Sequence, residues 1–284
     1  MQNFEFYSAE TIEDGLVYLS ERAEGCRIIA GGTDLIPLLR TQEVRPAHVL
    51  DILNVADLKG VRETGDGIRI GPATTFTEME ASELLQREAS LLVQAAASVG
   101  GPQIRNRGTV GGNIATASPA ADVLPALMAL DAALEIRSSS AGIRVVPLVS
   151  AIEKPYAPGL RPGELITGIL LPKPVPGTRG GFEKLGRRNA LARARMNMSV
   201  VLRMDSSGRL AEIRIVPGAV MPVARRMGEA ESILQGQRPE PDVLNAAAEA
   251  LAEGILSTTG RRWSSEYKIP VVKNVFKRVL QGLI

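Results

Sequence analysis

The sequence contains very few of the residues that carry thiol, imidazole and aromatic chemistry. Its 284 residues include one cysteine (Cys26), one histidine (His48) and one tryptophan, and 4% of them are aromatic. One cysteine cannot form an internal disulfide or supply the four thiolates of an iron–sulfur cluster or a structural zinc site. A Ser-His-Asp or Cys-His mechanism would have to use His48. Chemistry on this chain therefore depends on carboxylates, backbone donors or a bound organic cofactor.

Long apolar runs are also missing. The first residues are acidic rather than basic and lead into no apolar core of a signal peptide. No run of eighteen apolar residues is present that would span a membrane. We therefore expect no transmembrane segment and a cytoplasmic location.

The net charge of +2 hides an uneven distribution. Residues 1–100 carry 8 Lys and Arg against 16 Asp and Glu, whereas residues 101–200 carry 13 against 6. The arginines of this basic middle are scattered and have almost no aromatic neighbours, so we expect no nucleic-acid binding. The charges indicate a solvated face or an anion site.

Apolar periodicity and turn residues predict an α+β fold. Thr11 is the expected N-cap of a helix that Gly25 ends, and Asp66-Gly67 marks a hairpin between Val61 and Ile70. Further strands are predicted at 4–7, 27–30, 49–53, 133–137, 143–147, 165–171, 182–185, 198–204 and 210–217, and further helices at 35–39, 87–99, 123–130, 227–234, 242–253 and 265–280. Runs of strands with helices on one side favour α+β over a doubly wound sheet. Residues 172–181, rich in proline and glycine, are the best candidate for a linker.

Two Gly-Gly motifs are the features that carry chemistry. The first is Ala30-Gly31-Gly32-Thr33-Asp34, between a predicted strand and a predicted helix, and the second is Thr109-Val110-Gly111-Gly112-Asn113. Glycine allows positive φ values, which bring consecutive N–H groups to a phosphate. A lone Gly-Gly is usually only a tight turn, but two of them beside threonine favour a diphosphate ligand. No G-x-G-x-x-G and no P-loop motif is present, so these residues alone predict a diphosphate ligand of unspecified kind.

The longer runs around these motifs resemble a known family. Residues 29–35 (IAGGTDL) and 103–122 (QIRNRGTVGGNIATASPAAD) are similar to the FAD-binding medium subunit of molybdenum hydroxylases, a family that includes the flavin subunits of carbon monoxide dehydrogenases and xanthine dehydrogenases. The resemblance covers essentially the whole chain.

The resemblance implies an architecture and a set of cofactor contacts. It implies a p-cresol methylhydroxylase-type FAD-binding domain over 1–175, with subdomains at about 1–56 and 57–175, and a C-terminal flavoprotein domain over 176–284. It assigns FAD contacts to Ile28, Ile29, Ala30, Gly31, Gly32, Thr33, Asp34, Leu35, Thr109, Val110, Gly111, Gly112, Asn113, Asp122, Ile166 and Lys184. The Lys184 charge would favour an anionic reduced flavin, although an ordinary surface lysine is an equal interpretation.

The resemblance also implies a role in electron transfer. An oxidoreductase complex of this kind passes electrons from a [2Fe-2S] small subunit, after oxidation at a molybdopterin large subunit, through FAD to an acceptor such as NAD, a quinone, oxygen or ferredoxin. The expected assembly is a dimer of heterotrimers, and no residue of this chain needs to be catalytic. The alternatives are a freestanding oxidase of the vanillyl-alcohol oxidase type and a non-catalytic nucleotide-binding protein.

One segment departs from the family pattern. After Arg187-Arg188 the family commonly has an acidic residue, whereas this chain has Leu191-Ala192-Arg193-Ala194-Arg195. The departure leaves the electron acceptor open. Arg193 and Arg195 would attract an anionic acceptor or an acidic partner, unless they are ordinary solvated arginines.

Overall fold

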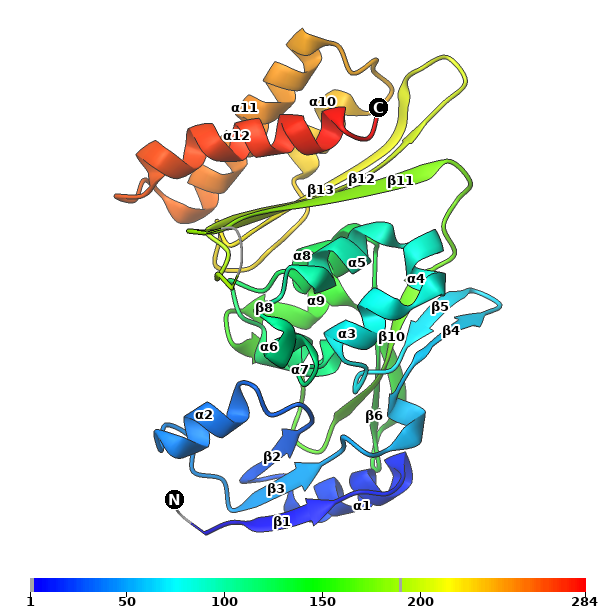
Figure 1. The fold of residues 1–284 in the computed structure, drawn as a ribbon, viewed down its shortest axis with the longest axis vertical. Coiled ribbons are helices and arrows are strands. Elements are labelled where there is room, and N and C mark those ends of the chain that lie inside the picture. Colours follow the sequence, from blue (N-terminus) through cyan, green and yellow to red (C-terminus); the bar gives the residue numbers. More distant parts are fainter. Residues whose placement is uncertain (1–2, 189–190) are drawn as a thin grey trace.

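The computed structural model describes residues 3–188 and 191–284 of the chain. The elements form three layers stacked along the long axis, with the N-terminal residues at one end and the C-terminal helices at the other (Figure 1). Mixed helices and separate sheets confirm the predicted α+β class. No helix of the described residues is long and apolar enough to cross a membrane.

The N-terminal layer is a small parallel sheet. Its elements are β1 (Glu5–Ser8), α1 (Ile12–Arg22), β2 (Cys26–Ile29), α2 (Leu35–Arg40) and β3 (His48–Asp51), with the strand order β1-β3-β2. Thr11 caps α1 as predicted, because its side chain accepts a hydrogen bond from Asp14 N at 3.1 Å. The strand predicted over 27–30 corresponds to β2, but an interpretation of this strand as buried is wrong, since β2 is an edge strand and its residues are half-buried or exposed.

The middle layer is built around an antiparallel sheet. Its strands are β4 (Val61–Thr64), β5 (Gly67–Ile70), β6 (Ala133–Ser138), β7 (Gly142–Pro147) and β10 (Leu165–Pro172), in the order β4-β5-β10-β6-β7. The predicted hairpin is confirmed: Val61 pairs with Ile70, and Gly67 has φ +151°. Short elements complete the layer: η1 (Ala56–Leu58), α9 (Leu148–Ala151), β8 (Ile152–Lys154) and β9 (Ala157–Pro158).

Helices of the middle layer cover this sheet. They are α3 (Phe76–Ala81), α4 (Glu83–Glu88), α5 (Ser90–Ala97), α6 (Pro102–Arg105), α7 (Val110–Thr116) and α8 (Val123–Ala129). The single helix predicted over 87–99 is wrong, because the chain leaves helical geometry at Ala89, with φ −145° and ψ 47°. Neither glycine nor proline marks this break, so apolar periodicity runs through it.

The C-terminal layer is an antiparallel meander with one short and two long helices above it. Its elements are β11 (Thr178–Leu185), β12 (Met196–Met204), β13 (Leu210–Gly218), α10 (Gly228–Leu234), α11 (Pro241–Thr259) and α12 (Ser265–Gln281). β11 begins four residues before the predicted strand, so residues 173–177 alone connect the two sheets.

Both faces of the C-terminal sheet are covered, against the expectation of helices on one side. Side chains of β12 alternate: Met196, Met198, Val200 and Leu202 face the core beneath α10–α12, whereas Val201 packs in the core of the middle layer. Figure 1 shows α5 and α8 beneath this sheet. The middle and C-terminal layers therefore share one buried interface.

Candidate functional site

The first glycine motif leaves a run of backbone donors unused. It forms the loop between β2 and α2, and Gly32 takes a positive φ of +73° as predicted. Within the part of the chain that the structure describes, the N–H groups of Gly31 through Leu35 have no hydrogen-bond partner. Because α2 has only six residues, its dipole adds little, and the loop amides themselves are what attract an anion.

The second glycine motif uses almost all of its own donors. Predicted as a loop, residues 110–113 instead form the first turn of α7, and neither Gly111 nor Gly112 has a positive φ. The N–H groups donate to Thr74 O (from Val110, 3.0 Å), Pro72 O (from Gly111, 2.8 Å), Thr109 Oγ1 (from Gly112, 3.2 Å) and Thr109 O (from Asn113, 3.0 Å). The expectation of positive φ values at these two glycines is wrong, whereas FAD binding by this segment stays a prediction.

Close packing explains why the second motif needs glycine. A Cβ atom on Gly111 would lie 2.4 Å from Pro72 Cβ and 2.7 Å from Pro72 O. α7 therefore sits directly on the backbone that follows β5. Two atoms of this motif remain without a partner among the described residues: Thr109 N and the buried Asn113 Oδ1.

The two motifs, far apart in the sequence, lie against each other. A Cβ on Gly31 would fall 1.8 Å from Arg107 O, so the first loop touches the backbone that enters the second motif. Thr116 Oγ1 at the end of α7 donates to Asp34 Oδ2 at 2.9 Å. Figure 1 shows α2 facing α6 and α7 across this contact. One site thus combines five free amides with Thr109 N and a buried carbonyl oxygen that needs a donor.

The chain matches two known protein families, which together cover nearly its whole length. Residues 2–174 match the family described as "FAD binding domain in molybdopterin dehydrogenase", and residues 181–283 match the "CO dehydrogenase flavoprotein C-terminal domain". The chain belongs to the FAD-binding subunits of the molybdopterin dehydrogenases. The chain is therefore a subunit of an oxidoreductase, as the resemblance implies.

Individual relatives are similar to this chain over nearly its whole length. The chain is 31% identical to the putative xanthine dehydrogenase FAD-binding subunit of Escherichia coli, over 98% of this chain and 95% of that protein. It is 32% identical to the carbon monoxide dehydrogenase medium chain of Afipia carboxidovorans, over 98% and 96%. A carbon monoxide dehydrogenase structure from Hydrogenophaga pseudoflava superimposes with a TM-score of 0.92 at 28% identity, covering 99% and 97% of the two chains.

The residues of the FAD-binding subunit fit the phosphate part of FAD. Among the described residues, the run of unpartnered amides matches the anionic phosphate oxygens, whereas the buried Asn113 Oδ1 is an acceptor without a donor and matches a hydroxyl group of the cofactor rather than a phosphate. Glycine at position 31 also leaves the loop free of a side chain where it meets Arg107. The individual contacts assigned to residues 28–35 and 109–113 stay predictions.

Asp122 and Lys184, assigned to FAD separately, form an ion pair with each other. Lys184 Nζ on β11 donates to Asp122 Oδ2 at 2.5 Å and to Ser98 O at 2.8 Å. Asn197 Nδ2 on β12 donates to Asp122 Oδ1 at 3.1 Å. The pair lies in the interface between the middle and C-terminal layers, and only 6% of Asp122 is exposed.

Burial dominates the chemistry of this pair. Burial raises the pKa of the Asp122 carboxyl, and Lys184 and Asn197 oppose that rise through charge and hydrogen bonds. The Lys184 ammonium is thus engaged by a carboxylate and a carbonyl, which is a structural role. A contact of Lys184 or Asp122 with FAD stays a prediction.

Ile166 offers little side-chain surface to a ligand. It lies in β10, pairs with Ile136 of β6 and is 5% exposed inside the core of the middle layer. The strand is irregular between Ile166 and Gly168. A contact between Ile166 and FAD stays a prediction.

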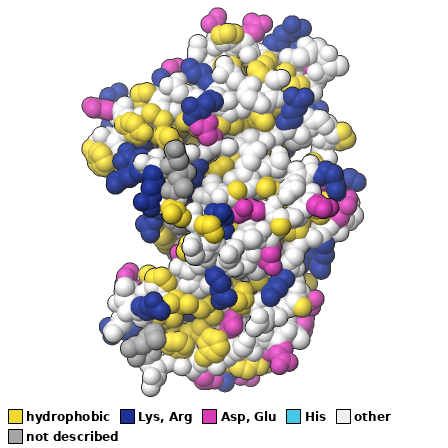
Figure 2. Space-filling model, viewed as in Figure 1, with side chains coloured by type: hydrophobic (Ala, Val, Ile, Leu, Met, Phe, Trp, Pro, Cys, Tyr) yellow, Lys and Arg dark blue, Asp and Glu magenta, His cyan; other side chains and the backbone are white. Residues whose placement is uncertain are grey.

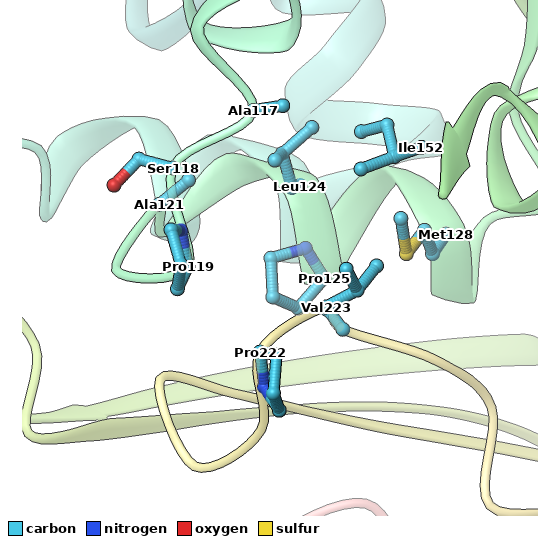
Figure 3. A pocket seen from close by; sticks show the side chains of 11 residues that line it. Ala117, Ser118, Pro119, Ala121, Leu124, Pro125, Met128, Ile152, Pro222 and Val223 are labelled. Carbon is cyan, nitrogen blue, oxygen red and sulfur yellow. The ribbon is translucent and has the colours of Figure 1, made fainter. Parts of the chain in front are cut away.

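A crevice beside Asp122 is too small for a cofactor. It lies between the end of α7, α8 and the segment around Pro222 and Val223 (Figure 3). Its volume is about 10 Å³, which is at most the space of one water molecule. The open face of the two glycine motifs remains the candidate site.

Sequence reasoning missed residues that shape the site through contacts. Pro72 and Thr116 position α7, and Asn197 holds Asp122. Asn197 had a detectable signal, because it is a polar residue inside a run of apolar strand residues, where a buried amide needs a partner. Pro72 and Thr116 had none, since their roles depend on segments distant in the sequence.

Proposed function

We propose that this chain is the electron-transfer subunit of a heterotrimeric molybdenum hydroxylase. A [2Fe-2S] small subunit would deliver electrons after substrate oxidation at a molybdopterin large subunit. An external acceptor would remove them, with NAD, a quinone, oxygen and ferredoxin as the candidates. We further propose a dimer of heterotrimers in the cytoplasm.

The observation that carries this proposal is the run of five unpartnered amides from Gly31 to Leu35, held against α7. When bound, FAD supplies the redox chemistry. The chain's own residues bind the anionic phosphates and hold the cofactor in position. None of its side chains has to donate or accept a proton in the reaction. Lys184 and Asp122 would hold the C-terminal layer in place beside the site.

The layers support the proposed domain limits. The sheet of the middle layer ends at Pro172 and the C-terminal sheet begins at Thr178. Within the described residues, the two sheets share no strand. We propose a FAD-binding domain over residues 1–175, with subdomains at about 1–56 and 57–175, and a C-terminal flavoprotein domain over 176–284.

The alternatives are less well supported. The relatives are named as subunits or medium chains, which favours a partner-dependent role over a freestanding oxidase of the vanillyl-alcohol oxidase type. A non-catalytic nucleotide-binding protein would not carry a flavin. Absorption of the purified protein in the flavin bands separates that alternative from the other two.

Affinity purification of the native protein tests the proposal. We expect one FAD per chain, with molybdenum, iron and two further subunits in the same complex. Recovery of FAD without molybdenum, iron or partner chains would defeat the heterotrimer and support a freestanding oxidase. A colourless protein that binds nucleotides but not FAD would defeat the flavoprotein assignment itself.

A further inference from the structure

At one end of the C-terminal layer lies a group of cations that has no acidic partner among the described residues. It combines two segments, the residues just before β12 and the residues at the start of α12, and we call it the arginine surface. Its members are Arg193, Arg195, Arg261, Arg262 and Lys268, together with the aromatic residues Trp263 and Tyr267. Figure 2 shows Lys and Arg side chains gathered with hydrophobic ones at the left edge of this layer.

Contacts show that the two segments form one surface. The Arg195 guanidinium lies 5.6 Å from the centre of the Tyr267 ring. Burial lowers the pKa of the Lys268 ammonium, and the nearby charges of Arg195 and Arg262 lower it further. Cations from both segments therefore crowd together. Among the described residues, none of the five cations takes part in an ion pair, and Glu266, exposed in the same turn, pairs with none of them.

The arrangement suits a protein better than a small anion. Trp263 is 92% exposed, which is costly for a large aromatic side chain in water. Tryptophan, tyrosine and arginine are the residue types that dominate the energetics of protein interfaces. The hollow between Arg262 and Lys268 has a volume of about 30 Å³, which is too small for a nucleotide.

The surface is connected to the cofactor site. Leu191, two residues before Arg193, packs on the start of α6, where a Cβ on Gly101 would lie 2.2 Å from Leu191 Cδ2. α6 leads directly to Arg107, whose carbonyl oxygen meets Gly31. A protein bound on the arginine surface would thus sit beside the segment that borders the glycine motifs.

We infer that the arginine surface is the docking site of an acidic electron-accepting protein. This inference rests on the proposed function, because it assumes that electrons leave from this chain. Positive charge without neutralising acids would steer an acidic partner and raise its association rate. Trp263 and Tyr267 would provide the apolar contact at its centre.

The test uses the complex purified through a tag on this chain and an acidic plant-type [2Fe-2S] ferredoxin as the probe. The variant Arg193→Ala/Arg261→Ala removes two exposed cations that have no hydrogen-bond or ion-pair partner of their side chains within residues 3–188 and 191–284. The matched control Arg62→Ala/Arg238→Ala removes the same charge at two distant positions. Arg62 lies in β4 of the middle layer. Arg238 lies at the opposite end of the C-terminal sheet, next to Gln237, whose carbonyl oxygen accepts a hydrogen bond from Leu210 N. Trp263→Ala is the third variant. Binding is measured by thermophoresis at 50 and 300 mM salt, with NADH as a small anion for comparison.

We expect the Kd for ferredoxin to rise about tenfold in the double variant at low salt, with a much smaller change at high salt and none in the control. Trp263→Ala should weaken binding about fivefold at both salt concentrations. FAD, iron and partner subunits should stay at wild-type levels in all variants. Equal ferredoxin binding by variant and control would overturn the inference, as would absence of ferredoxin binding by the wild type or weakened NADH binding alone.

Two further outcomes separate this inference from the proposed function. Loss of the partner subunits from the double variant would assign the arginine surface to assembly and overturn the docking role. A wild-type preparation without FAD or partner chains would instead defeat the proposed function.

Discussion

The two motifs share a Gly-Gly pair but have opposite physical roles. In the first, Gly32 takes a left-handed conformation and the following N–H groups have no partner in the described part of the chain. In the second, the glycines are helical and their N–H groups are satisfied by the chain itself, while Gly111 packs on Pro72. Paired glycines thus indicate either an exposed set of donors or a close approach between two segments. Only the hydrogen-bond partners distinguish the two cases.

The largest expected effect comes from Gly111→Ala. The added Cβ would meet Pro72 Cβ at 2.4 Å and Pro72 O at 2.7 Å, and backbone cannot move as a flexible side chain would. We expect the free energy of unfolding of the FAD-free protein to fall by about 3 kcal/mol, measured by urea denaturation.

Gly112→Ala is the matched control for this packing role. Its Cβ would meet only Thr109 Oγ1, at 3.0 Å, and alanine favours a helix over glycine by roughly 0.5–1 kcal/mol. We expect a change of less than about 1 kcal/mol. Similar stability losses in the two variants would show that α7 is not fixed through Pro72.

Gly32→Ala tests the opposite role of the first motif. A left-handed conformation costs an alanine about 1–2 kcal/mol, and the nearest atom, Ile36 Cδ1 at 2.8 Å, belongs to a side chain that can shift. The strain should displace the free amides, so we expect the Kd for FAD to rise about tenfold, measured by flavin fluorescence titration.

Gly25→Ala provides the control, because Gly25 is also left-handed, at φ +82°, but lies before β2 and away from the free amides. It should lower stability to a similar extent and leave FAD affinity unchanged. An equal loss of FAD affinity in both variants would mean that general destabilisation, rather than the first motif, controls binding.

Asn113→Ala asks whether the second motif contributes to binding through its unpartnered oxygen. Without FAD, removal of a buried oxygen that has no donor should leave the free energy of unfolding within about 0.5 kcal/mol of the wild type or raise it. With FAD, the lost hydrogen bond should raise the Kd about fivefold. The variant should therefore weaken FAD binding without weakening the fold.

Ser199→Ala removes another buried oxygen without a partner, in β12. It should have the same small effect on stability and no effect on the Kd for FAD. Unchanged FAD affinity in Asn113→Ala would restrict the second motif to packing.

Local patterns predicted most of the fold. Caps and turns such as Thr11 and Asp66-Gly67 depend on neighbouring residues, and the meander from β11 to β13 follows from alternating apolar residues. The break at Ala89 and the covering of the C-terminal sheet by α5 and α8 depend on packing between distant segments. Such packing cannot be predicted from the local patterns of a single sequence.

The site divides in the same way. The glycine motifs were recognisable from sequence, but their unequal hydrogen bonding depends on Thr74 and Pro72, which lie more than thirty residues before the second motif. The pairing of Lys184 with Asp122 was equally hidden, because it requires β11 to lie across the start of α8. Two residues that were assigned to a ligand one by one are thus also partners of each other, while their contacts with FAD stay predictions.

The smallest effect is expected at the hydrogen bond that joins the two motifs. Thr116→Val removes the donor to Asp34 Oδ2 with almost no change in side-chain volume. Because the bond is exposed, the free energy of unfolding should fall by only about 0.5–1 kcal/mol. The Kd for FAD should rise about twofold to threefold, since the first loop loses a contact with α7.

Thr77→Val is the control, because it removes a comparable exposed hydrogen bond, to Asn106 Oδ1 at 2.6 Å, that does not involve the first loop. If both variants changed FAD affinity equally, contact between the motifs would not be what holds the amides in place.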